Sequence, residues 1–268
     1  MSNLIGHTWG NADAYAAYMG RWSRPMAEGV LRWLRPEPGL DWLDVGCGTG
    51  ALTSAILDLA APGAVTGIDP SANFLDTARA RLTDPRVQFT VATAADLPFP
   101  TASFDVVIAG LVLHLIQDPL TAVQEMTRVA RAGGTVAAYV WDFTGERQFT
   151  HVFWNAATEL DPSAASFDPA TQTTLCAREP LAELLTAAGL HQVVVESIAM
   201  PVVFRGFDDY WLPHLLQGSP PAQRYTATLD EPALTSLRER LRTTLPIAAD
   251  GSLPLLGHVW AARGTKAT

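Results

Sequence analysis

The chain has 268 residues, of which 48% are hydrophobic and 17% charged, and its formal net charge is −9. This length and composition fit one globular domain with insertions better than two independent domains. An acidic average surface repels phosphate backbones, which argues against a nucleic-acid partner. The two cysteines, Cys47 and Cys176, are far apart and lie in no CxxC or His/Cys cluster, which argues against a disulfide framework and a structural zinc site.

The N-terminus and the most apolar run predict a protein that is neither exported nor embedded in a membrane. Residues 1–7 lack a charged stretch followed by an apolar one, so no export signal is predicted. The run 106–116 is too short to cross a bilayer and contains His114. We therefore expect a cytoplasmic protein with no membrane partner.

In chain order, aromatic residues on expected helices come first, and we assign residues 1–38 to an N-terminal helical cap. From residue 40 onward, short β-rich runs alternate with helical stretches, which is typical of a parallel sheet with crossover helices on both faces. The predicted fold is therefore α/β, with a seven-stranded, mostly parallel sheet. The strands are expected at residues 40–46, 64–69, 87–92, 104–110, 135–141, 193–199 and 255–262.

Helices between the strands are indicated by apolar residues at helical spacing. The Ser71 hydroxyl is placed to cap the start of one helix, and Gly133-Gly134 is expected to end another. Two helical faces are expected to pack on the sheet: Leu52, Ile56 and Leu59, and then Leu120, Val123, Thr127 and Ala130.

The alternation breaks again before the last strand, in a segment rich in aromatic residues and prolines. We assign residues 204–251 to a lid insertion, and residues 39–203 and 252–268 to the core of a single domain spanning 1–268. Aromatic residues in a lid are candidates for binding a substrate, although aromatic residues at helical spacing also form ordinary core. The substrate-binding candidates are Trp141, Tyr210, Trp211 and His214.

The sequence LDVGCGTG at residues 43–50 follows a predicted strand and opens a predicted helix. Glycines let the backbone turn sharply and approach a ligand, and a helix N-terminus offers free N–H groups. The pattern is GxGxG preceded by an acid, whereas the dinucleotide fingerprint is GxGxxG. A nucleotide-like cofactor other than a dinucleotide is therefore favoured.

Further segments follow in a fixed order: GIDPS at 67–71, ATAADLPF at 92–99, GLVLH at 110–114 and RVARAGG at 128–134. With LDVGCGTG, they resemble class I S-adenosylmethionine-dependent methyltransferases of the small-molecule type. YAAYMGRWS at 15–23 and YVWD at 139–142 resemble the ubiquinone and menaquinone methyltransferase-like branch. The resemblance implies a Rossmann-like sheet and S-adenosylmethionine as the cofactor.

The resemblance also implies roles for individual residues. Asp69 matches the acid that holds both ribose hydroxyls, and a carboxylate can accept two hydrogen bonds from a vicinal diol. Thr93 stands where the family has an acid beside the adenine, so that contact has no charge. Arg21 is suited to a carboxylate, and a surface salt bridge is its alternative role. The implied cofactor-binding residues are Asp44, Gly46, Cys47, Gly48, Gly50, Asp69, Pro70, Phe74, Thr93, Ala94, Ala95, Gly110, Leu111, Tyr18 and Arg21.

Methyl transfer is an in-line displacement, so positioning and exclusion of water supply much of the catalysis and a general base is optional. His114 is one catalytic candidate, and a structural histidine is its alternative reading. Asp142, at the end of the fifth strand, is the other, with capping of a turn as its alternative. His114 and Asp118 are too few for a metal site, so we expect no metal.

Two rival functions remain open at this point. A dehydrogenase-like nucleotide binder is disfavoured by the glycine spacing. A protein that binds S-adenosylmethionine without transferring the methyl group is compatible with Thr93 and with the absence of a clear base. We expect a small, apolar or aromatic acceptor molecule, and the sequence leaves the oligomeric state open, a homodimer included.

Overall fold

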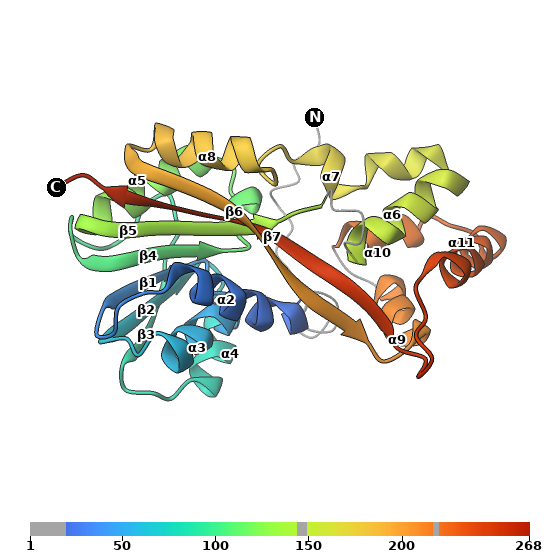
Figure 1. Ribbon diagram of the computed structural model, residues 1–268, viewed down its shortest axis with the longest axis horizontal. Coiled ribbons are helices and arrows are strands. Elements are labelled where there is room, and N and C mark those ends of the chain that lie inside the picture. The colour runs from blue at the N-terminus through green and yellow to red at the C-terminus, as the bar shows by residue number, and fades with distance from the viewer. Residues whose placement is uncertain (1–19, 144–148, 217–219) are drawn as a thin grey trace. The chain divides into compact units, whose positions relative to one another are not determined.

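The computed structural model describes residues 20–143, 149–216 and 220–268 (Figure 1). Tyr18, one of the expected cofactor contacts, lies outside these residues. Seven strands form one sheet in the order β3-β2-β1-β4-β5-β7-β6. They are β1 (Asp41–Val45), β2 (Ala64–Asp69), β3 (Val87–Val91), β4 (Phe104–Gly110), β5 (Ala130–Trp141), β6 (Leu190–Phe204) and β7 (Leu253–Lys266).

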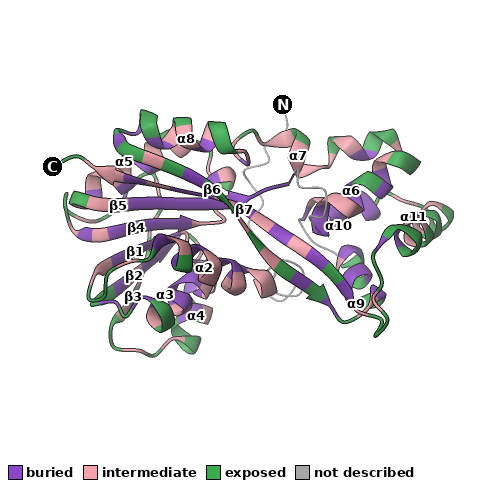
Figure 2. Cartoon of the chain, in the orientation of Figure 1, coloured by how far each residue is buried: buried purple, intermediate pink, exposed green. Residues whose placement is uncertain are grey.

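The sheet is mostly parallel, as predicted. β1 pairs in parallel with β2 and β4, β2 with β3, and β4 with β5. β6 and β7 point in opposite directions in Figure 1. β1 and β4 are buried along most of their length because they lie inside the sheet, whereas β3, at its edge, is largely half-buried or exposed (Figure 2).

β5 starts earlier than predicted, which also corrects the expected role of Gly133-Gly134. Helix α5 (Pro119–Val129) ends before these glycines, and the chain is already extended at Ala130. The register shifts so that Phe104 pairs with Ala130 and Val106 with Thr135. The glycines therefore lie in an irregular part of the strand, where Gly133 has a φ of +74°.

Helices lie on both sides of the sheet, with α3 (Ala51–Leu59) and α4 (Ala72–Arg81) on one side and α5 and α8 (Arg178–Ala187) on the other (Figure 1). The Ser71 cap is confirmed, since its hydroxyl accepts from the Phe74 N–H. The expected helical faces are partly wrong, because Leu59 is 46% and Leu120 37% exposed. Asp118 caps α5 and Pro119 begins it, and in that register the residues at helical spacing that face inward are Ala122, Val123, Met126 and Val129.

The described residues group into two compact units, which we describe separately. The first, here called the core unit, comprises residues 23–140, 175–198 and 259–268. The second, called the helical unit, comprises the described residues up to 22, between 141 and 174, and between 199 and 258. It contains α6 (Phe149–Leu160), η4 (Pro162–Ser166), α7 (Pro169–Gln172), α9 (Phe207–Trp211), η5 (Leu212–Leu215), α10 (Pro221–Thr226) and α11 (Glu231–Thr244), while α2 (Arg21–Leu34) begins in it. The division into a cap, a core and a lid at residues 204–251 stays a prediction.

Candidate functional site

The candidate cofactor site lies in the core unit, at the carboxyl ends of three neighbouring strands. β1 lies between β2 and β4, so the loops after Val45, Asp69 and Gly110 leave the same edge of the sheet. The strand order reverses between β1 and β4. Ligands of open α/β sheets bind outside the carboxyl ends of the strands at such a point.

The glycine loop turns sharply from β1 into α3. The N–H groups of Gly46 and Cys47 both donate to the Ile68 carbonyl oxygen, at 2.8 and 2.9 Å. Gly46 has a φ of +72°, and a Cβ there would lie 2.7 Å from a methyl carbon of Val112. Gly48 also has a positive φ, of +54°, but a Cβ there would meet no described atom within 4 Å. Gly46 is thus required by packing, whereas Gly48 leaves open space beside the backbone.

Asp69 links the loops that follow β1 and β2. Its Oδ2 accepts from the Gly48 N–H at 3.0 Å, and its Oδ1 accepts from the Ser71 N–H at 2.8 Å. Burial raises the pKa of Asp69, and the two backbone N–H groups oppose that rise. The neighbouring Pro70 is exposed and Phe74 is half-buried. The carboxylate is therefore fixed beside the glycine loop, and its oxygens keep further lone pairs for a ligand.

Asp44 is a second acid of the glycine loop, in a very different environment. It is fully buried, and its Oδ2 accepts from the Thr53 hydroxyl at 2.7 Å. Its Oδ1 is buried and has no hydrogen-bond partner among the described residues. Burial raises the pKa of Asp44 from 3.8 to about 7, and it also raises the pKa of the Cys47 thiol. Thr53 was not predicted as part of this site.

The expected adenine loop follows β3. The Ala92 N–H donates to the Asp69 carbonyl oxygen at 3.3 Å, and Thr93 forms an isolated bridge with Asp96. Thr93 and Ala95 are exposed, and Ala94 is half-buried. The structure thus joins the start of this loop to Asp69 through a backbone hydrogen bond.

The end of β4 carries the remaining core-unit candidates. A Cβ on Gly110 would lie 2.5 Å from the Tyr139 hydroxyl oxygen, so the tyrosine requires a glycine there. Leu111 follows with a φ of +59°, which is costly for a residue other than glycine, and its N–H donates to the Tyr139 carbonyl oxygen at 2.8 Å. His114 lies in η3 (Leu113–Leu115), and burial lowers its pKa to about 4. Its imidazole is therefore neutral at pH 7.

In the helical unit, the four substrate-binding candidates belong to an aromatic core. Trp141 packs edge-on against Phe149 at 5.8 Å between ring centroids, and the Tyr210 hydroxyl donates to the Phe149 carbonyl oxygen at 2.9 Å. His214 lies with its Nδ1 2.8 Å from the Tyr210 carbonyl oxygen, and burial lowers its pKa to about 4. Trp211 is also buried, and its ring is stacked with that of His214 at 6.3 Å between ring centroids.

Two further candidates of the helical unit are held by specific contacts. Arg21 donates from Nη1 to Oδ1 of Asp209 at 2.9 Å, and its guanidinium lies 4.6 Å from the ring centroid of Phe204. Arg21 thus forms a partly buried salt bridge within the helical unit, and its role in binding the cofactor stays a prediction. Asp142 is buried, and its N–H donates to the His258 carbonyl oxygen at 2.9 Å.

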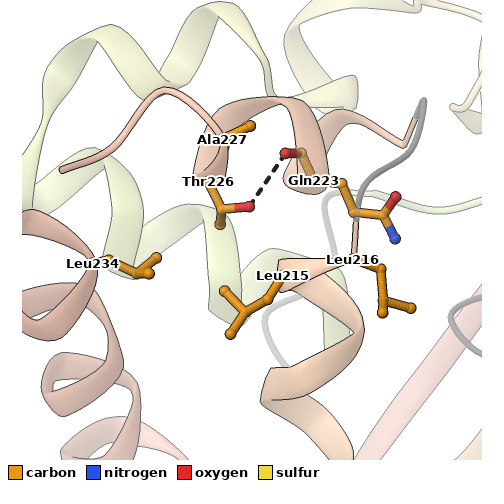
Figure 3. Close-up of a pocket in the computed structure, with 6 residues that line it drawn as sticks. All are labelled: Leu215, Leu216, Gln223, Thr226, Ala227 and Leu234. Carbon is orange, nitrogen blue, oxygen red and sulfur yellow. Dashed lines mark hydrogen bonds between the residues drawn. The ribbon is translucent and has the colours of Figure 1, made fainter. Parts of the chain in front are cut away.

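A cavity of about 160 Å³ lies in the helical unit (Figure 3). Gln223 is buried in its wall and donates from Nε2 to the Pro213 carbonyl oxygen at 2.9 Å. Its Oε1 is buried without a hydrogen-bond partner among the described residues. None of the predicted residues lines this cavity, and no motif in the sequence pointed to it. The lining residues are Leu215, Leu216, Gln223, Thr226, Ala227 and Leu234.

Within residues 20–143, 149–216 and 220–268, no three His, Cys, Asp or Glu side chains are grouped as metal ligands would be. None of the helices in those ranges is both long and apolar enough to span a bilayer.

Residues 43–138 match the family model of the methyltransferase domain. A demethylmenaquinone methyltransferase of Staphylococcus aureus is 38% identical over 109 residues, which are 40% of this chain and 45% of that enzyme. The chain thus spans less than half the length of this relative.

Solved structures share the fold. A Bacillus halodurans protein assigned to the methyltransferases has a TM-score of 0.59 at 18% identity, covering 90% of this chain and 99% of that one. Phosphoethanolamine N-methyltransferase 2 of Haemonchus contortus, in complex with phosphomonomethylethanolamine and S-adenosylhomocysteine, has a TM-score of 0.56 at 20% identity, covering 96% of this chain and 57% of that one.

Proposed function

We propose that the protein binds S-adenosylmethionine and transfers its methyl group to a small molecule, and the match of residues 43–138 to the methyltransferase domain supports this. The observation that carries this proposal is the Asp69 carboxylate, held at the end of β2 by the N–H groups of Gly48 and Ser71. Its free lone pairs suit the two hydroxyls of a ribose. The GxGxG loop fits such a cofactor better than a dinucleotide.

The residues present fit this cofactor. The open space at Gly48 lets a ligand approach the backbone, and Thr93 with its neighbours forms the proposed adenine contact. Gly110 and Leu111 are proposed to lie beside the methionine part. When bound, S-adenosylmethionine supplies an electrophilic methyl group on a cationic sulfur, and the Asp69 carboxylate favours a cationic ligand at this edge.

The acceptor is proposed to be a small apolar or aromatic molecule. The acidic net charge of −9 supports this over a nucleic acid, whose binding needs Lys and Arg to neutralise phosphates. An acceptor that is methylated on a hydroxyl or an acidic carbon loses a proton. His114 and Asp142 are the proposed acceptors of this proton; burial keeps His114 neutral at pH 7, and its lowered pKa also makes it a weak base.

The first test is calorimetric titration with S-adenosylmethionine, S-adenosylhomocysteine and NADH. We expect saturable binding of the two sulfur ligands and its loss in Asp69→Ala. The matched control is Asp76→Ala, because Asp76 is an exposed aspartate of α4 paired with Arg79. Binding of NADH alone would refute the proposal in favour of an oxidoreductase.

A second measurement separates methyl transfer from binding alone. The protein is incubated with S-adenosylmethionine and a panel of phenols, quinols and amines, and S-adenosylhomocysteine is quantified by mass spectrometry. Acceptor-dependent formation of this product is expected. Tight cofactor binding with no product for any acceptor would favour the alternative of a binding protein without transfer.

A further inference from the structure

Glu125 and Arg128, three residues apart in the last turns of α5, bind the backbone of the loop that follows β3. Arg128 donates from Nη1 to the Phe99 carbonyl oxygen at 2.8 Å and from Nη2 to the Leu97 carbonyl oxygen at 2.9 Å. Glu125 Oε2 accepts from the Leu97 N–H at 3.0 Å. Two charged side chains of one helix thus hold three backbone groups of the loop.

The two side chains also fix each other. Arg128 donates from Nε to Oε1 of Glu125 at 2.7 Å and from Nη2 to Oε2 at 2.8 Å, which is a bidentate pair. The side chains are only 34% and 20% exposed, so solvent screens the pair less than it screens a surface pair. The hydrogen bond from Arg128 lowers the pKa of Glu125, so the pair is charged across neutral pH.

The proposed adenine contacts lie between this pair and a second anchor. At the other end, the Ala92 N–H donates to the carbonyl oxygen of Asp69. Between the anchors, Thr93 and Asp96 form a narrow turn, and Thr93 and Ala95 are exposed. Because exposed residues have little packing of their own, the position of this turn depends on its two ends.

We propose that Glu125 and Arg128 form a clamp that positions residues 93–96 for the adenine of the cofactor, an inference that rests on the proposed function. They are positioning residues and do not touch the cofactor. Thr93 offers a short side chain without charge, so recognition at this turn relies on backbone groups and one hydroxyl. Backbone groups and a short side chain cannot reach toward a displaced adenine as a long side chain can. Binding of the adenine therefore depends closely on where residues 93–96 lie.

The test compares clamp variants with a matched control. Glu125→Ala and Arg128→Ala are expected to raise the Kd of S-adenosylhomocysteine and the KM for S-adenosylmethionine about tenfold, with kcat unchanged at saturating cofactor, because the lost contacts serve binding alone. Methylthioadenosine, which keeps the adenosine and the sulfur but lacks the amino-acid part, should lose affinity by the same factor. Glu125→Gln keeps an oxygen for the Leu97 N–H and should recover part of the loss.

Arg131 supplies the control, because it also forms short ion pairs but at the opposite end of the strands. It pairs with Asp105 at 2.6 Å and with Asp41 at 3.1 Å, and Asp105 accepts the Asp41 N–H. Arg131→Ala should lower the melting temperature like the clamp variants but leave the Kd of S-adenosylhomocysteine within twofold.

Each outcome decides the inference. If both clamp variants bind S-adenosylhomocysteine within twofold of the unmodified protein while their melting temperatures fall, the pair is only structural and the inference is overturned. If the alanine variants do not fold, Arg128→Lys decides instead, because a lysine cannot donate to both loop carbonyls and Glu125 at once as the guanidinium does, and an unchanged Kd in it overturns the inference. If the unmodified protein binds neither ligand, the proposed function itself fails, a result that is visible before any variant is made.

Discussion

Replacing Asp44 with Asn tests whether a buried carboxyl of the glycine loop makes the stability of the protein depend on pH. Asp44 is fully buried, and burial raises its pKa from 3.8 to about 7. Asn has nearly the same shape but does not ionise. Between pH 3.8 and about 7, the folded protein therefore keeps a proton that the unfolded chain has already lost.

The sign and size of the effect follow from this difference in pKa. Because the folded pKa of Asp44 is the higher one, its contribution to stability is complete below pH 3.8 and is lost as pH rises through about 7. At about 1.4 kcal/mol per pH unit, the whole loss is roughly 4 kcal/mol. The hydrogen bond from Thr53 limits the rise in pKa, and the nearby charge of Asp69 adds to it.

Urea unfolding of the unmodified protein and of Asp44→Asn at pH 5, 6, 7 and 8 measures the effect. From pH 5 to pH 7, the unmodified protein is expected to lose roughly 3 kcal/mol of unfolding free energy relative to Asp44→Asn. Above pH 7 the difference between the two should level off. Asp76→Asn, at an exposed position, should give a flat difference. A flat difference for Asp44→Asn would show that the carboxyl is already ionised at pH 5 and would refute the reasoning.

Two other sites give sharp expectations. Gly46→Ala combines a φ of +72° with a clash against Val112 and should lower the unfolding free energy by about 3 kcal/mol. Gly48→Ala has open space and should lower it by about 1 kcal/mol. Urea unfolding of both variants measures the two losses, and equal losses would contradict the packing argument. Burial lowers the pKa of His214 from 6.5 to about 4, so its contribution to stability is present above pH 6.5 and is lost as pH falls through 4, by roughly 3 kcal/mol in all. His214→Phe should therefore unfold at a lower pH than the unmodified protein, as followed by circular dichroism. If both proteins unfold at the same pH, the lowered pKa of His214 is refuted.

The first four strands could be predicted to within a residue because their apolar runs are short and bounded by turn residues. β5 begins five residues before its predicted start at 135, since the glycines that seemed to end a helix lie within the strand. The buried face of α5 was also misjudged at Leu120. Its apolar side chain suggested burial, but the position of the helix start, set by Asp118 and Pro119, turns it toward solvent.

The candidate site was predictable where strand order alone brings residues together. The loops after β1 and β2 leave neighbouring parallel strands, so the meeting of Gly48 and Asp69 follows from the order of the motifs. The clamp was not predictable in this way. Glu125 and Arg128 have the spacing of an ordinary pair on a helix surface, and only their distant backbone partners give them a further role. The cavity at Gln223 depends on how short helices pack, which no local pattern encodes.

The two acids at this edge of the sheet show how surroundings divide one chemical group into two roles. Asp69 accepts hydrogen bonds from two backbone N–H groups, which stabilise its charged form and oppose the rise in pKa that burial causes. Asp44 accepts from Thr53 on Oδ2 while its Oδ1 stays without a partner among the described residues, so burial dominates and its proton is retained to about pH 7. Asp69 is therefore the acid suited to accept hydrogen bonds from a ligand as a carboxylate. Asp44 is suited to tie the glycine loop to α3, because a largely protonated acid can stay buried there without a second partner.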